Sequence, residues 1–125
     1  MIVINGAAND ISTMRSNTIN AVGKMARFVQ KHNNTNIIIV NIPPRYGPEK
    51  ASVINSEIRA FNKQLLNIGK AYRHVNILET DLDRKLFTRH GMHLNKRGKE
   101  WLSKSLATQI SKLVINIGRG HQKLP

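Results

Sequence analysis

The sequence predicts one α/β domain, a three-layer α/β/α arrangement with a parallel sheet between helices. The 125 residues suffice for a single core, and 40% of them are apolar. Short apolar runs, which predict strands, alternate with longer segments of helical periodicity. The resulting order is strand–helix, repeated three times. The run at residues 37–42 is rich in β-branched residues without polar alternation, which is typical of a parallel strand buried on both faces. Right-handed crossovers would connect such strands.

The first strand and helix are expected within residues 1–32. An apolar run at residues 1–5 predicts the strand, and a turn of small residues follows at 6–10. Ser12 or Thr13 can cap a helix that extends to about His32. Its apolar positions recur at helical spacing: Ile19, Val22, Met25, Ala26 and Val29.

The next two strands enclose a long helix. The second strand, residues 37–42, stops at Pro43-Pro44, and the third is expected at residues 75–78. Between them a helix is predicted from about Ser52 to Tyr72. Its apolar stripe consists of Ile54, Ile58, Phe61, Leu65, Ile68 and Tyr72.

The last third of the chain is expected to hold a long loop and a final helix. Residues 80–95 form the loop, with one short turn near Asp83, and Asn95 can cap the helix. The stripe of that helix is Leu102, Leu106, Ile110 and Leu113. We place the domain at residues 1–114 and expect a basic, disordered tail at 115–125.

Composition restricts the function classes. Twenty Lys and Arg against seven Asp and Glu give a net charge of +13, which attracts polyanions in a salt-dependent manner. The alternative is a solvated basic surface with only incidental affinity, because the charge is spread along the chain and aromatic residues are few. The absence of cysteine excludes disulfides and Cys-based zinc sites. No apolar run approaches the length of a membrane span, so a soluble intracellular protein is expected.

Two histidines three positions apart, His90 and His93, stand in the polar loop before the last helix. A histidine can accept a proton at neutral pH, so His93 is a candidate general base. It would need a partner to hold its tautomer: a backbone carbonyl, Asp81 or Asp83. A metal pair or a packing role for the loop is the alternative. Since no third ligand has suitable spacing, we expect neither a metal site nor a cofactor.

Asn9 follows the first strand and is the second candidate. A side-chain amide at the end of a strand can donate a hydrogen bond to an oxyanion. The alternative for Asn9-Asp10 is an Asx-turn or a helix cap, neither of which involves catalysis.

Three segments in this order resemble the SGNH/GDSL hydrolase superfamily, and within it the SGNH-like domains associated with retroelements. They are Val3–Ile11 with Asn9-Asp10, Ile37–Pro43, and Phe87–Asn95 followed by Gly98. The resemblance covers roughly residues 1–114. It implies a flavodoxin-like SGNH hydrolase fold, ester hydrolysis by Ser/His chemistry, Asn9 as an oxyanion donor and His93 as the base.

The chain also departs from the family pattern. It lacks the Gly-Asp-Ser block with the nucleophile and the block with the oxyanion-hole glycine, and His90 stands where the family has Asp. Ala7 stands where the family has Gly, unless Gly6 takes that role. We therefore interpret the chain as the C-terminal part of such a domain, incomplete at its N-terminus and inactive alone.

Three interpretations follow. As a partial hydrolase domain, the chain would act on an ester substrate only if the N-terminal part were supplied. Its first strand would then be a hydrophobic edge prone to self-association. The alternatives are a noncatalytic nucleic-acid-binding module of a retroelement-type protein, and a folded remnant without activity.

Overall fold

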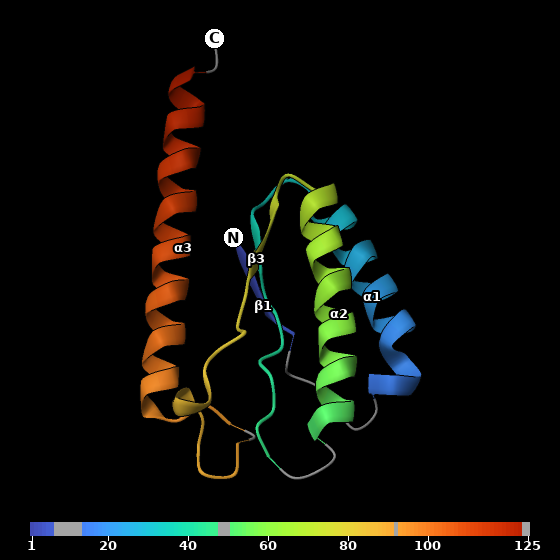
Figure 1. Cartoon of the computed structure of the whole chain (residues 1–125). Helices are drawn as coiled ribbons and strands as arrows, with labels where there is room; N and C mark the ends of the chain where they lie inside the picture. The colour runs from blue at the N-terminus through green and yellow to red at the C-terminus, as the bar shows by residue number, and fades with distance from the viewer. Residues whose placement is uncertain (7–13, 48–50, 92, 124–125) are drawn as a thin grey trace.

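A three-stranded parallel sheet forms the centre of the computed structural model, which describes residues 1–6, 14–47, 51–91 and 93–123. The strands are β1 (Ile2–Asn5), β2 (Ile37–Val40) and β3 (Val75–Leu78), in the spatial order β1-β2-β3. All three run in the same direction, so their carboxyl ends meet at one edge of the sheet, at the bottom of Figure 1.

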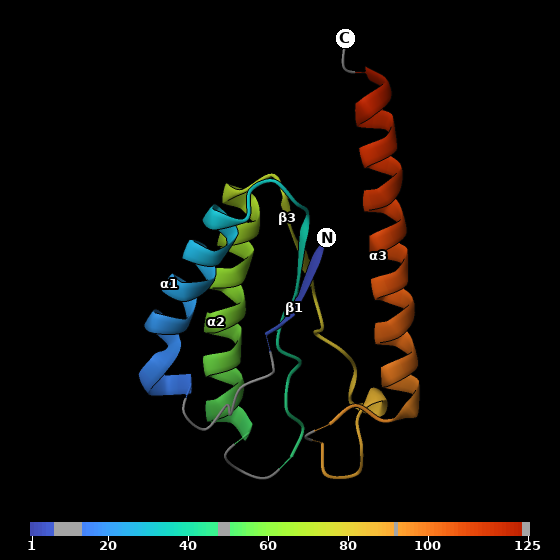
Figure 2. The same cartoon turned by 180° about the vertical axis from the view of Figure 1, so that it is seen from behind.

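The helices lie on both sides of this sheet. Helices α1 (Met14–Lys31) and α2 (Ala51–Ala71) cover one face, while α3 (Lys96–Lys123) lies on the other side (Figures 1 and 2). A short 3-10 helix, η2 (Arg84–Leu86), precedes α3. Two successive right-handed crossovers between neighbouring strands place α1 and α2 on the same face. The predicted α/β class with a parallel sheet is confirmed.

The main core lies between the sheet and the pair α1 and α2. Strand β2 is buried along its whole length, as its β-branched sequence predicts. The predicted α2 stripe is confirmed, since each of its members is buried in or packed against this core: Ile54, Ile58, Phe61, Leu65, Ile68 and Tyr72. From α1, Val29 is fully buried, and Val22, Met25 and Ala26 pack beside it.

Two element boundaries differ from expectation. Strand β2 ends at Val40 rather than Ile42, because the Ile42 amide donates to the Asn62 side chain instead of a neighbouring strand. Helix α3 continues to Lys123, whereas we expected a disordered tail from residue 115. The helical spacing of apolar residues extends past Leu113, and no proline occurs between Lys96 and Pro125. The short turn predicted near Asp83 is confirmed as η2.

Strand β1 is one edge of the described sheet. It pairs with β2 on one side only, in the register Ile2 to Ile37 and Asn5 to Val40. Ile2 and Ile4 pack against the core, so Val3 points to the α3 side, where 46% of its surface is exposed. The α3 side of β1 is therefore only partly covered.

Candidate active-site loop at the carboxyl edge of the sheet

The two candidate histidines lie in a small hairpin between η2 and α3. Phe87 and Leu94 form an isolated antiparallel bridge, and the Thr88 amide donates to the His93 carbonyl at 2.8 Å. The Gly91 amide donates to the Thr88 carbonyl, also at 2.8 Å, which closes a tight turn with His90 near its tip. Both His90 and His93 are exposed. The backbone thus holds the turn and leaves both imidazoles accessible.

Gly91 attaches this turn to the loop that follows β2. The Tyr46 amide donates to the Gly91 carbonyl at 2.8 Å, and Gly91 has the left-handed φ of +73°. A Cβ at this position would lie 1.4 Å from the Tyr46 carbonyl oxygen. Only glycine permits both the backbone conformation and the close approach.

Arg84 of η2 holds the same turn from the other side. Its guanidinium donates to the Thr88 carbonyl at 3.0 Å and to the Arg89 carbonyl at 2.9 Å. The guanidinium carbon also lies 6.0 Å from the centre of the Tyr46 ring, at the outer limit of a cation–π contact. One cation therefore links η2, the histidine turn and the loop after β2.

Tyr46 is the common contact of these segments. Its hydroxyl donates to the Leu82 carbonyl at 2.5 Å, and its ring meets Phe87 edge-on at 4.9 Å between centroids. Burial raises the pKa of the Tyr46 phenol above its ordinary value near 10, as do the nearby carboxylates of Asp81 and Asp83, while Arg84 lowers it. The neutral phenol is thus the form that the fold favours.

Two asparagines of α2 position the segment that leads to Tyr46. The Asn62 side chain accepts from the Ile42 amide at 3.0 Å and donates to the Ile42 carbonyl at 2.8 Å. Asn55 makes the same pair of bonds with Arg45, both at 2.7 Å. Pro43 and Pro44 between them have no N–H to donate. We call these two bidentate contacts the amide clamps.

The distance between the two asparagines along α2 matches the length of the segment that they hold. Asn55 and Asn62 are seven residues apart, which is about 10.5 Å along a helix. Ile42 and Arg45 are three residues apart, which is about 9 Å in an extended, proline-rich conformation. The match allows both clamps to form at once, with the segment antiparallel to α2.

A buried polar contact joins the ends of β2 and β3. Asn41 and Thr80 are almost fully buried. The Thr80 amide donates to the Asn41 side-chain oxygen at 2.8 Å, and the Thr80 hydroxyl lies 2.7 Å from the same oxygen. The contact fixes where the chain leaves the sheet towards the histidine turn.

Asn95 fixes the start of α3, as its predicted capping role requires. Its side-chain oxygen accepts from the Gly98 amide at 2.9 Å, and its amide donates to the carbonyls of Lys85 and Phe87. A Cβ on Gly98 would lie 2.3 Å from the Leu86 carbonyl oxygen, so glycine lets α3 approach η2 closely.

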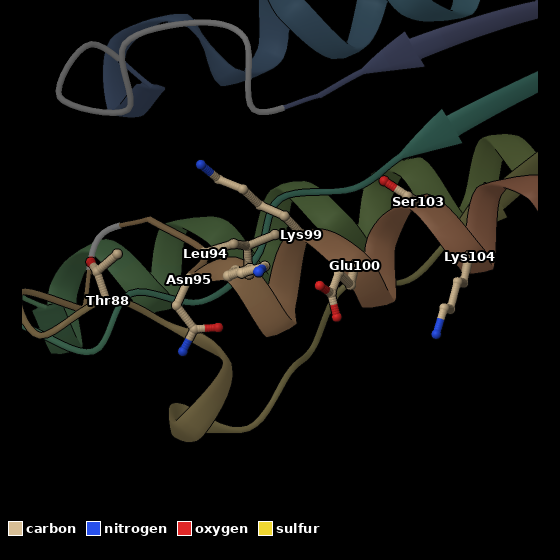
Figure 3. Close-up of a pocket in the computed structure, with 8 residues that line it drawn as sticks. Thr88, Leu94, Asn95, Lys99, Glu100, Ser103 and Lys104 are labelled. Carbon is tan, nitrogen blue, oxygen red and sulfur yellow. The ribbon is translucent and has the colours of Figure 1, made fainter.

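A shallow hollow of about 680 Å³ lies beside the start of α3. Most of the residues that line it have polar or charged side chains, although much of the lining surface comes from their carbon atoms; Figure 3 shows these side chains. They are Thr88, Leu94, Asn95, Lys96, Lys99, Glu100, Ser103 and Lys104. The hollow adjoins the histidine turn through Thr88, but neither His90 nor His93 lines it.

The structure brings together two of the three loops that follow the strands. The loops after β2 and β3 meet at the Tyr46–Gly91 bond. Asn9, which follows β1, lies outside the described residues. Within the described ranges, no hydrogen bond or ion pair joins Asp81 or Asp83 to His93.

The residues that hold the loop were not identified from the sequence. Sequence patterns assign no role to Tyr46, and they place Asn55 and Asn62 only within the helix expected from about Ser52 to Tyr72. A detectable signal existed: two asparagines seven positions apart on a helix that directly follows a Pro-Pro segment. Such a segment cannot satisfy its own backbone groups.

Comparisons with known proteins found no match among protein-family models, curated proteins or solved structures. In the part of the chain that the structure describes, no helix has the length and hydrophobicity to cross a membrane. The same residues contain no group of three His, Asp or Glu side chains that could bind a metal ion.

Proposed function

We propose that the chain is part of an SGNH/GDSL-type hydrolase domain, with His93 as general base and Asn9 as oxyanion donor. The observation that supports this most is the position of the His93 turn at the carboxyl edge of a parallel sheet. Sites of open α/β sheets form outside this edge. The turn is attached there by the Tyr46–Gly91 bond, and His93 is accessible.

The arrangement of strands and helices also supports the proposal. In the flavodoxin-like strand order 2-1-3-4-5, the last three strands are consecutive neighbours. Strands β1, β2 and β3 are consecutive neighbours too, with α1 and α2 on one face and α3 on the other. In this proposal, a further parallel strand would pair with the free edge of β1.

That further strand would have to bring the nucleophile. The sequence contains no Gly-Asp-Ser motif. Among residues whose side chains the structure describes, the serines lie within helices and not in a strand-to-helix turn: Ser56, Ser103, Ser105 and Ser111. Since ester cleavage by covalent catalysis needs an activated hydroxyl beside the base, the proposal assigns no esterase activity to this chain alone.

The test is hydrolysis of p-nitrophenyl acetate, measured with and without a co-expressed strand–helix segment that carries Gly-Asp-Ser. The 125-residue chain alone should give no turnover above an imidazole blank. With the segment supplied, turnover should appear. His93→Ala should then lower it by about 10²–10⁴-fold and Asn9→Ala by about 10²–10³-fold.

His32→Ala is the matched control, because His32 stacks on Phe28 at the far end of α1. It should leave turnover unchanged. Turnover by the chain alone that disappears in His93→Ala would contradict the inactive assignment. A complemented complex whose turnover is independent of His93 would contradict the hydrolase proposal itself.

A further inference from the structure

Cationic side chains gather around the start of α3. The proposed hydrolase function assigns no role to them. Seven exposed Lys and Arg lie from η2 to the third turn of α3: Arg84, Lys85, Arg89, Lys96, Arg97, Lys99 and Lys104. Three exposed acids accompany them: Asp81, Asp83 and Glu100. The balance is positive, and η2 contacts α3 directly, so these charges together give a positive potential around the start of α3.

The shallow hollow lies within this surface. Lys96, Lys99 and Lys104 line it, together with Thr88 and Ser103. Figure 3 shows Lys99 and Lys104 extending from α3 in opposite directions, so their ammonium groups lie apart rather than together. An extended ligand with several negative charges could contact both, whereas a single small anion could not.

We propose that this surface, defined by Lys96, Lys99 and Lys104, binds the phosphate backbone of double-stranded nucleic acid without reading its sequence. Lys96 and Lys104 are eight residues apart, about 12 Å along the helix. That length spans about three phosphates of one strand, which follow at about 3.4 Å along the duplex axis. Lysine ammonium groups, which are mobile point charges, suit such contacts.

The lack of stacking platforms favours a duplex over a single strand. Single-strand binders place aromatic rings under successive bases. No Phe, Tyr or Trp side chain that the structure describes is exposed, and Trp101 of α3 is half-buried. Affinity then depends on charge density alone, which is higher in the duplex.

The orientation of α3 favours nucleic acid over a membrane surface. An interfacial helix inserts its apolar face into lipid. The apolar stripe of α3 is half-buried, and includes Trp101, Leu102, Leu106, Ile110 and Leu113. The exposed residues nearest the lysines instead include Ser103, Thr108 and Ser111, and the exposed apolar pair Val114 and Ile115 lies more than two turns beyond Lys104.

The experiment is fluorescence anisotropy of a labelled 20-base-pair duplex of random sequence with the full 125-residue chain, titrated between 50 and 200 mM salt. The variant K96Q/K99Q/K104Q should reduce the slope of log K against log salt by about 2.7, since each lost phosphate contact contributes about 0.9. K96R/K99R/K104R should retain the slope. A duplex of different sequence should bind equally.

The matched control removes three exposed cations from α1, K24Q/R27Q/K31Q, with the same loss of net charge. If binding is confined to the surface at the start of α3, this control should change the slope of log K against log salt much less. Equal losses in both triple variants, or no binding of the wild type at 50 mM salt, would overturn the proposal. Tighter binding to vesicles of phosphatidylserine and phosphatidylcholine (1:3) than to duplex, at equal phosphate concentration, would also overturn it. Circular dichroism of each variant verifies the fold.

Discussion

At the scale of single residues, Gly91 connects the histidine turn to the rest of the sheet edge. Its left-handed backbone and its contact with Tyr46 each exclude a side chain. Gly23 of α1 is a useful contrast. A Cβ there would meet only the flexible end of the Arg27 side chain, at 3.4 Å. The same substitution therefore has opposite expected effects at the two positions.

Gly91→Ala should destabilise the protein by about 2–4 kcal/mol, because left-handed strain adds to the loss of the Tyr46–Gly91 hydrogen bond. Gly23→Ala should stabilise it by up to about 1 kcal/mol, as is usual for glycine within a helix. Urea unfolding followed by circular dichroism measures both. A Gly91→Ala protein as stable as the wild type would contradict the described turn.

At the scale of elements, the amide clamps make α2 responsible for the shape of the loop after β2. Each clamp satisfies one N–H and one carbonyl that no strand pairs. Helix α2 thereby contributes to the candidate site twice. Its apolar stripe packs against the sheet, and its two asparagines fix the position of the segment that leads to Tyr46.

Asn62→Ala should cost about 1–3 kcal/mol, since two hydrogen bonds to Ile42 are lost. Asn67→Ala is the matched control on the same helix; Asn67 is exposed, so its replacement should be nearly neutral. The double variant N55A/N62A should cost less than the sum of the two single variants, because the clamps hold one segment. Chemical denaturation of all four proteins provides the comparison, and strict additivity would show that the clamps act independently.

At the scale of the whole molecule, β1 is an edge strand that lacks the features by which edge strands usually avoid pairing with another chain. Its sequence, Ile-Val-Ile-Asn, contains no charge and no proline, and Val3 is half-exposed on the α3 side. The large positive charge opposes association of identical chains, but salt screens that repulsion. Association through β1 should therefore increase with salt, the opposite of duplex binding.

Val3→Lys should lower the weight-average mass in sedimentation equilibrium at 0.5 M salt, because a charged side chain on an edge strand opposes pairing. Val53→Lys, at a similarly exposed valine of α2, should leave the mass unchanged. A wild-type protein that stays monomeric at every concentration and salt would refute association through this edge.

Patterns of apolar residues were enough to predict the architecture of the molecule, but not the contacts that join its loops. Strand β3 was predicted with its observed ends, and every apolar position of the α2 stripe contributes to the core. Contacts between distant segments, such as Tyr46 with Gly91, leave no periodic signal. The tail predicted to be disordered is helical to Lys123, because Gly118 and Gly120 weaken a helix without ending it. The roles of His93 and Asn9 remain predictions.

The amide clamps also determine where the chain can change in length. Inserting one residue between Asn55 and Asn62 would rotate one asparagine by about 100° around α2. Deleting one residue between Ile42 and Arg45 would shorten the segment by about 3 Å. Either change would open a clamp. Within residues 42–62, insertions and deletions among related sequences should therefore be excluded from both stretches and should occur only between Tyr46 and the start of α2.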